Sequence, residues 1–408
     1  MTVIWMGLFF LLLLGFVSLA IDMGRLRLAR EQLQTAADAG ARAGATALPL
    51  ADGQTDAGDK VQEAYDRAEA TSEANECLRV YVAGAGNGVE VVPDEDVTLG
   101  RWNRIARTFT ALEDDARRGA NAVRVVTRRI SDRSNPINLT FAPAVGVFSK
   151  NEETVGIAMI TGGPRNFGIV GIDYIDGTGN PGQVDSYDAS AGPYDPNNFN
   201  HNGSVASDGD ITMGNGDVYG DARPGMDDGE VTQGPNSVIT GWTAPLDIIL
   251  ADLYPPATVP GGTPSGPPIP NQGNATMTLT GGTVGSPARY HYNSFKMKGN
   301  QILALTGPVE LYVTGDVDIK GMSWSNMSAN PGWLKIIVVG SGTSVDIGGT
   351  SQIAAHIYAP QSAITVHGTE DFFGAMVGKS IDMKGTADIH YDESVDPAAV
   401  PFVTVLVR

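Results

Sequence analysis

The sequence predicts a chain of mixed α+β and all-β class, with an N-terminal transmembrane helix, a small α+β membrane-proximal domain and a C-terminal parallel β-solenoid. Three observations predict it. Residues Val3–Ile21 form an uncharged apolar run, the segment up to Arg165 carries short alternating apolar and polar runs, and the last third repeats a short glycine-containing unit. The 51 glycines and 24 prolines favour turn-rich β structure.

Charge excludes one class of partner. The 408 residues include 27 basic and 46 acidic side chains, a net charge of −19, which repels nucleic acid phosphates. Up to Arg165 there are 18 basic and 21 acidic residues, and beyond it 9 and 25, so the chain changes character near residue 165. The single cysteine, Cys77, excludes an intrachain disulfide, and we expect it to be a partly buried thiol.

The apolar run Val3–Ile21 has 19 residues, close to the roughly 20 that cross a bilayer as a helix. We interpret it as a single-pass membrane span. A cleaved signal peptide is the alternative, because Ser18 and Ala20 are small residues of the kind that signal peptidase requires. No Lys or Arg precedes the run, which favours the span.

The helix is expected to continue beyond the membrane. From Asp22 to Leu48 there is no proline, small or apolar residues recur every three or four positions, and Pro49 marks the end. Small side chains allow close approach of another backbone. Two interpretations stay open: packing on the chain's own domain, or assembly with a second copy or pilin-like subunits, which we predict. The predicted assembly face comprises Ala36, Gly40, Ala43 and Gly44.

The middle segment predicts a helix and then strands. Residues 50–76 have helix-compatible spacing, and short β-like runs follow from Leu78. The runs are LRVYVAG, VEVV, NAVRVVTRRI, INLTFAP and TVGIAMITGG. Val123, Val125 and Thr127 alternate with Arg124 and Val126, which indicates a half-buried strand.

Internal repeats dominate the C-terminal part. Three segments align without gaps at offsets of 19 and 17 residues: VDIGGTSQI (345–353), ITVHGTEDF (364–372) and IDMKGTADI (381–389). Looser copies begin at Ile211, Phe295 and Val317. Each unit supplies two inward apolar side chains and a glycine, and stacked units bury a continuous core. This predicts a three-sided β-solenoid; an antiparallel sandwich is the alternative.

The alignment also assigns individual positions. Gly368 should occupy a corner with positive φ. Asp318, Asp346 and Asp382 are repeat-equivalent and should form an outward acidic column, and His367 and Lys384 share one outward position.

Two stretches are irregular by composition. Asp173–Asn202 is predicted to be a loop, and Pro255–Asn271 a Pro/Gly-rich excursion. The expected organisation is 1–48 membrane and pilin-like helix, 49–165 small α+β domain, 166–274 irregular loops with the first solenoid turns, 275–396 solenoid and 397–408 a C-terminal strand.

The N-terminal residues carry a family resemblance. GFVSLAIDMGRLRLAREQLQTAADAGARAGATAL resembles the start of Tad (Flp) pilus-assembly proteins of the TadE/TadG-like type, in which an apolar span leads into A-x-D-x-G-R-L and an Ala-rich helix. VTLGRWNRIARTFTAL (97–112), NAVRVVTRR and FAPAVGV are similar to the same family. No Gly-Glu processing signature precedes the span, and Trp5 stands where a mature type IV pilin carries glutamate, which favours an unprocessed TadG-like component. The C-terminal repeats resemble β-helical tails of some pilus-associated surface proteins and, more distantly, bactofilins.

The resemblance implies an exported, membrane-anchored structural protein of the bacterial envelope that assembles, anchors or decorates a Tad-type pilus. Its partners would be the membrane and pilin-like or other Tad components, and not nucleic acid. Arg25, Arg27 and Arg30 follow the span, so the positive-inside rule by itself places the C-terminal part in the cytoplasm. We give the family resemblance more weight than the arginines and expect a single pass through the inner membrane, with the C-terminal part exported.

Two other function classes stay open. A surface adhesin would bind glycan or host surface through the solenoid and acidic loops, and a β-helical polysaccharide-active enzyme would need aromatic and acidic residues clustered in one groove. We expect no catalytic residues, no cofactor and no histidine metal site, because the five histidines lack ligand spacing. Acidic turns are candidates for weak calcium binding, namely Asp173, Asp176, Asp227 and Asp228.

Overall fold

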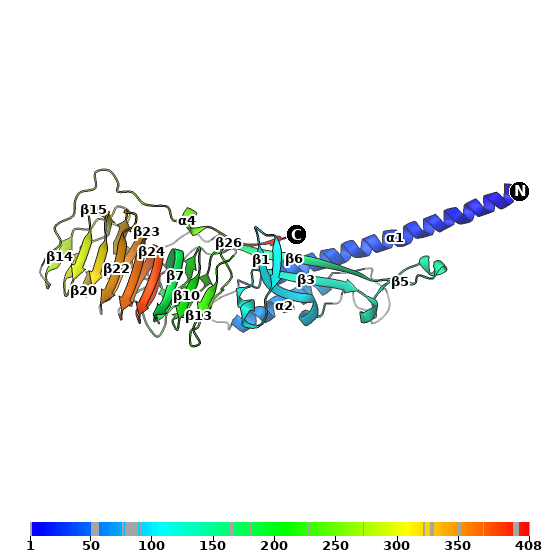
Figure 1. The fold of residues 1–408 in the computed structure, drawn as a ribbon, viewed down its shortest axis with the longest axis horizontal. Helices are drawn as coiled ribbons and strands as arrows, with labels where there is room; N and C mark the ends of the chain where they lie inside the picture. Colours follow the sequence, from blue (N-terminus) through cyan, green and yellow to red (C-terminus); the bar gives the residue numbers. More distant parts are fainter. Residues whose placement is uncertain are drawn as a thin grey trace. The chain divides into compact units, whose positions relative to one another are not determined.

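The chain folds as two compact units, each described here by itself. Unit 1 comprises residues 1–50, 58–161 and 402–408, and unit 2 comprises 51–57 and 162–401. The computed structural model (Figure 1) describes residues 2–49, 57–75, 77, 89, 91–163, 167–179, 181–226, 228–271, 273–320, 323–326, 330–349, 352–369, 371–394 and 400–407. The main division falls after Thr161, close to the change of charge at Arg165, but the end of the chain rejoins unit 1.

Helix α1 (Thr2–Ala45) is one continuous helix with two different halves. In the first half large apolar side chains are exposed, among them Phe9 at 68% and Phe16 at 65%. An 18-residue window of this half has a mean hydropathy of 2.5 and no buried residue, so the helix is long and apolar enough to cross a membrane. In the second half Ala29, Leu33, Ala37 and Ala41 are fully buried in unit 1.

The small-residue face of α1 packs against α2 (Ala57–Glu73) of the same chain. A Cβ on Gly40 would collide with Ser72 Oγ, and one on Gly44 would lie 2.9 Å from the carbonyl oxygen of Ala64. Ser72 Oγ donates to the carbonyl of Ala36 at 3.2 Å. Of the predicted assembly face, Ala36, Gly40 and Gly44 are buried and Ala43 is half-buried, so in the structure three of its four residues pack within the chain.

Unit 1 is built on an antiparallel sheet of order β2-β1-β3-β6-β26, with the second half of α1 against β3. Thr127 Oγ1 on β3 donates to the Leu33 carbonyl at 2.9 Å, which fixes helix to sheet. The elements are α3 (Pro93–Asp96), β1 (Val97–Asn103), β2 (Thr108–Ala111), η1 (Asp114–Gly119), β3 (Ala122–Arg129), η2 (Ser131–Arg133), β4 (Ile137–Asn138), η3 (Ala142–Val145), β5 (Ser149–Lys150), β6 (Glu152–Gly163) and β26 (Val400–Leu406).

Unit 1 confirms two expected elements and corrects two others. The helix expected over 50–76 is confirmed over Ala57–Glu73 by α2, and the strand at Val123–Thr127 is confirmed by β3. The strand expected over 137–143 is wrong beyond Asn138, where the chain turns into the 3₁₀ helix η3. Pro143 cannot donate to a ladder, and Asp22 accepts the amides of residues 140–142 instead. The run LRVYVAG lies outside the described residues. Of VEVV (89–92) only Glu90 does, and Val89, Val91 and Val92 belong to no strand, so a strand there is wrong.

The regular structure of unit 2 consists almost entirely of parallel strands. They are β7 (Ile169–Gly179), β8 (Gln183–Tyr187), β9 (Val205–Ser207), β10 (Ile211–Gly214), β11 (Asp217–Val218), β12 (Ala222–Arg223), β13 (Val231–Gln233), β14 (Thr276–Leu279), β15 (Ala288–Tyr292), β16 (Phe295–Lys298), β17 (Ile302–Leu305), β18 (Val309–Val313), β19 (Val317–Lys320), β20 (Ser323–Asn326), β21 (Leu334–Val338), β22 (Ser344–Gly349), β23 (Ile353–Gly368), β24 (Asp371–Gly385) and β25 (Asp388–Asp392). A short helix, α4 (Leu250–Leu253), and a 3₁₀ turn, η4 (Pro331–Trp333), interrupt them.

These strands stack in three parallel ladders, which the chain visits in turn. The first ladder contains β14-β17-β20 and the start of β23, the start of β24, β25, β8 and β11. The middle ladder runs β15-β18-β21, then through the middle of β23 and β24 to the start of β7, β9 and β12. The last ladder runs β16-β19-β22, then through the ends of β23, β24 and β7 to β10 and β13. Inward side chains of all three ladders form one hydrophobic core.

The register of the last ladder confirms the repeat alignment. Val345 pairs with Ile364, and Ile364 with Ile381, as the ungapped alignment requires. The looser copies join the same ladder, since Phe295 pairs with Val317 and Val317 with Val345. Asp318 pairs with Asp346, and His367 with Lys384, in outward positions.

Glycines close the corner after this ladder. Gly349, Gly368 and Gly385 stand in register, with φ of 140°, 115° and 114°. A side chain at the last of them would collide with the carbonyl oxygen of Gly368. The positive φ expected at Gly368 is confirmed.

The order of strands in the stack differs from their order in the chain. β24 pairs with β7, and β25 with β8, so the segment that begins unit 2 continues the stack where the C-terminal repeats stop (Figure 1). At this level one turn of the stack is made by two segments about 200 residues apart: β25 supplies the first ladder, and β7 supplies the middle and last ladders. We call this turn the split turn.

The two stretches predicted as irregular differ in outcome. The loop prediction for Asp173–Asn202 is wrong over its first half, which contains most of β7 and all of β8. Few inward apolar residues suffice there, because neighbouring strands provide the backbone partners. Pro255–Asn271 has no regular element in its described residues but is tied to the stack: Tyr358 Oη donates to the Pro255 carbonyl at 2.5 Å, and Tyr292 Oη to that of Pro267 at 3.1 Å.

The corner glycine gives a direct test of the register. Gly368→Val should destabilise the protein by well over about 1 kcal/mol, because a β-branched residue is strained at φ of 115°. Asp382→Asn on the outer face should change stability by no more than about 0.5 kcal/mol. Denaturant unfolding of the detergent-solubilised chain measures both, and equal large losses would contradict the register.

Candidate functional site

A pocket lies on the outer face of the first ladder, around the split turn. Its volume is about 390 Å³. Strands β23, β24, β25 and β8 form its floor, and Pro193, Tyr194 and Pro196 of the loop after β8 form a wall. Residues from both ends of unit 2 are therefore needed to build it.

Two outward positions of the ladder repeat across the pocket floor. Alternate residues of a strand face the same side, so residues two apart on each strand both face the pocket. From strand to strand the first position carries Gln352, Asp371, Asp388 and Gln183, and the second carries Ala354, Phe373, His390 and Asp185. The second position departs from apolar residues at His390 in the split turn and at Asp185 on the strand that follows it in the ladder.

His390 is held in one orientation by Asp185. Its Nδ1 lies 2.6 Å from Asp185 Oδ1, and the imidazole is 3% exposed while the carboxylate is fully buried. The other oxygen of Asp185 accepts from Tyr194 Oη at 2.6 Å and from Gln183 Nε2 at 2.8 Å. Because Asp185 Oδ1 accepts from the imidazole, a neutral His390 carries its proton on Nδ1.

Two aromatic rings enclose His390. The ring centroid of Tyr194 lies 3.8 Å from that of the imidazole, and the centroid of Phe373 lies 4.8 Å from it. Tyr187 contacts both rings edge to face, with centroids 5.6 and 6.0 Å away. Burial and the bond to Asp185 raise the pKa of the Tyr194 phenol, so this hydroxyl stays a donor.

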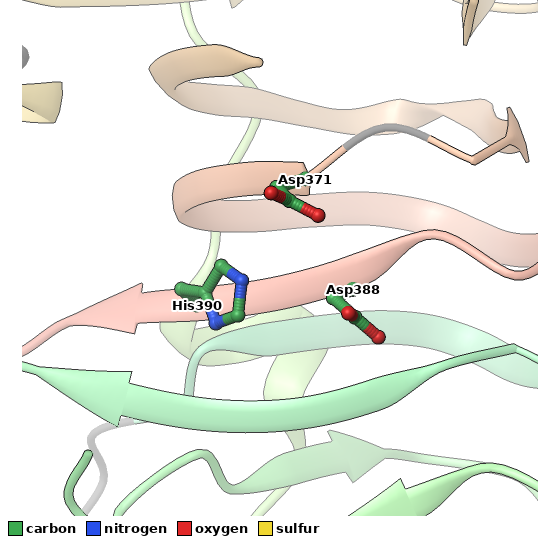
Figure 2. A group of neighbouring side chains, drawn as sticks. All are labelled: Asp371, Asp388 and His390. Carbon is green, nitrogen blue, oxygen red and sulfur yellow. The ribbon is translucent and has the colours of Figure 1, made fainter. Parts of the chain in front are cut away.

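Two carboxylates face the imidazole. Figure 2 shows Asp388 on the strand of His390 and Asp371 on the strand beside it. One ligand atom from each of the three residues lies within 4.8 Å of the others, the one such group among the described residues. Burial raises the pKa of Asp388, with Asp371 and Asp185 adding to the shift, while the Gln183 amide and His390 oppose it. The cluster offers metal ligands, and the rings and carboxylates are groups that bind saccharides.

A second histidine–aspartate pair stands beside the pocket. His356 Nε2 lies 3.9 Å from Asp392 Oδ2, across the small Ala375 of the intervening strand. Burial lowers the pKa of His356 to about 4, and Asp392 only partly opposes this. His356 is therefore neutral at pH 7.

The calcium candidates are not brought together. Asp173 lies 3.7 Å from Lys379 Nζ, and Asp176 accepts the amide of Thr178 at 2.9 Å. Neither they nor Asp228 belong to a group of three acidic or histidine ligands within the described part of the chain, and Asp227 lies outside it.

Sequence reasoning missed the pocket. The aligned repeats did place Asp371 and Asp388 at one position, two residues after the Gly-Thr pair that recurs in each unit. They contained no sign of Asp185 or Tyr194, which come from the segment predicted to be a loop.

A separate feature marks the end of the apolar half of α1. Asp22 is 2% exposed, and its carboxylate accepts the amides of Thr140, Phe141 and Ala142 at 2.8, 3.0 and 2.7 Å. Arg25 donates to Thr140 Oγ1 at 3.1 Å. The two charged residues of the A-x-D-x-G-R-L motif thus fix the hairpin β4–β5 to the helix.

Helix α1 is long and apolar enough to anchor the chain in a membrane, and comparison with known families gives three matches. A family model described as Flp pilus-assembly TadE/G-like matches residues 1–47, and one described as Tad-like Flp pilus-assembly matches residues 29–158. A domain family of unknown function, DUF7305, matches residues 272–397. No curated protein and no solved structure matches the chain.

The N-terminal region therefore matches Tad pilus-assembly families, as its motifs indicated, and the matches suggest a role related to Flp/Tad pili, in association with the membrane and other pilus components. The DUF7305 match ends near the split turn, so it covers β23–β25 of the pocket but not β8 or Tyr194.

The largely enclosed His356, with a side chain 12% exposed, predicts how stability depends on pH. Its pKa is lower in the folded chain, so between pH 6.5 and 4 the unfolded chain binds the extra proton. Stability should fall as pH falls through this window, by at most about 1.4 kcal/mol per pH unit from this group. His356→Gln should flatten that part of the profile in thermal unfolding, whereas the exposed-face variant His367→Gln should not. If stability falls with pH equally in wild type and in His356→Gln, the assignment of this pH dependence to His356 is contradicted.

Proposed function

We propose that the chain is an exported, non-enzymatic structural component that assembles, anchors or decorates a Tad-type pilus. The observation that carries the proposal is the division of α1. Its first half has no buried residue in its most apolar window, while its second half is part of the core of unit 1. A single rigid element thus joins a membrane span to a folded domain.

We infer that unit 2 is a β-solenoid. The support is the set of three parallel ladders around one core, with the same positions recurring at offsets of 19 and 17 residues. Such a stack presents repeated outward positions over a long surface, which suits display at a cell surface.

We further infer that both units lie outside the inner membrane. The family match favours this, and the arginine cluster after the span argues against it. Arg25 is engaged with Thr140, so part of that cluster has a role in holding the hairpin.

A labelling experiment tests the topology. Cys77 is buried, so it should be replaced by alanine and a new cysteine placed at Val284, which is 88% exposed. In spheroplasts, Val284→Cys should react with a membrane-impermeant maleimide without lysis. Labelling that requires lysis would overturn the exported topology.

The pocket favours a second candidate, the surface adhesin. Three aromatic side chains and two carboxylates around one cavity are groups that stack on and hydrogen-bond a sugar, namely Tyr187, Tyr194, Phe373, Asp371 and Asp388. This is also the cluster that a polysaccharide-active enzyme requires. Glycan binding without turnover would decide for the adhesin, and turnover would decide for the enzyme.

A further inference from the structure

We propose that His390, Asp371 and Asp388 bind a divalent transition-metal ion of the Zn²⁺ or Mn²⁺ type in the pocket. The geometry starts from His390. Its Nδ1 is engaged by Asp185, which leaves Nε2 as an acceptor, and no residue in the described ranges pairs with Nε2. Figure 2 shows the ring beside the two carboxylates.

The arrangement lacks a positive charge at its centre. One ligand atom from each of the three residues lies within 4.8 Å of the others. Carboxylate oxygens accept, as does the imidazole nitrogen that is not engaged by Asp185. The imidazole is 3% exposed, so bulk water does not surround it. A cation is the occupant that satisfies three converging acceptors.

The ligand types indicate which cation. Imidazole suits zinc and other first-row ions, whereas calcium prefers oxygen ligands throughout. Metal-binding histidines commonly donate their second N–H to a carboxylate, as His390 does to Asp185. Three protein ligands leave a further coordination position toward the cavity, where an oxygen of a bound ligand could reach the ion.

The test uses the chelator-treated, detergent-solubilised full chain at pH 8. Zn²⁺ should raise its melting temperature, and Co²⁺ should give a visible absorption band. Asp371→Asn, at a half-exposed position, should fold normally and lose both signals, as should His390→Gln. Asp185→Asn should weaken metal binding roughly 10- to 100-fold.

The matched control is His367→Gln. His367 also lies 2.7 Å from an aspartate, Asp346, but on the outer face of the last ladder, so both signals should stay. An unchanged wild-type melting temperature in Zn²⁺, or equal signals in wild type and Asp371→Asn, would overturn the proposal.

A second, independent observation concerns the tip of the β4–β5 hairpin in unit 1. We infer that this tip, residues 139–148, inserts into the membrane surface beside α1. Phe141, Val147 and Phe148 are 42%, 47% and 69% exposed. Exposed aromatic and aliphatic side chains gathered on one turn mark an interaction site.

The position of the tip identifies the bilayer as its partner. Asp22 holds the amides of residues 140–142 and directly follows the apolar run Val3–Ile21. The tip is therefore fixed at the level where the helix leaves the hydrocarbon region. Aromatic side chains are favoured at that interface, and a nearby arginine such as Arg25 suits lipid phosphates.

A fluorophore at the tip tests this inference, which rests on the membrane anchoring of α1. In a Cys77→Ala background, Phe148→Cys labelled with NBD should show blue-shifted emission in proteoliposomes and be quenched by lipids with a shallow nitroxide. Ile105→Cys, at an 80% exposed turn of the same unit, is the control and should show neither. Equal emission and quenching at the two sites would overturn the inference, whatever the topology experiment gives.

Discussion

The parallel pairing of very short strands is the constraint on which unit 2 depends. A strand such as Val317–Lys320 buries two side chains and leaves both backbone edges to be satisfied by neighbours. No turn of the stack is stable by itself, and a shift of one residue would turn inward side chains to solvent. This is why apolar residues, corner glycines and outward charges each keep their own register.

The split turn is a consequence of how this stack is threaded. The chain enters unit 2 at β7, builds two levels outward, passes along the segment Pro255–Asn271 and returns through β14–β25 to the place where it entered. Pairing of β24 with β7 then joins the two halves. The first and last parts of unit 2 must therefore both be present, and the end of the chain is directed back to β26 in the sheet of unit 1.

The pocket lies where this joining occurs. Within a run of similar turns an outward position repeats the same surface, but at the junction β25 meets β8, a strand from a different part of the sequence. Asp185 is buried against His390 there, and the loop after β8 closes over both. In unit 1, Asp22 has a comparable joining role, since one carboxylate links the end of the membrane span to a hairpin more than 100 residues later.

The sequence by itself determined the span, the strand register of the repeats and the Tad-type N-terminal region, because these depend on local periodicity and on motifs within a few tens of residues. The same local periodicity predicted the corner at Gly368 and the outward position of Asp346. Only the tertiary structure decided that Gly40 packs on Ser72, that Asp173–Tyr187 is mostly strand, and that Asp185 reaches His390. Each of these depends on a partner distant in the chain: α2 for the helix face, β24 for the backbone bonds of β7, and β8 for the histidine. Spacing within one segment carries no information about such partners.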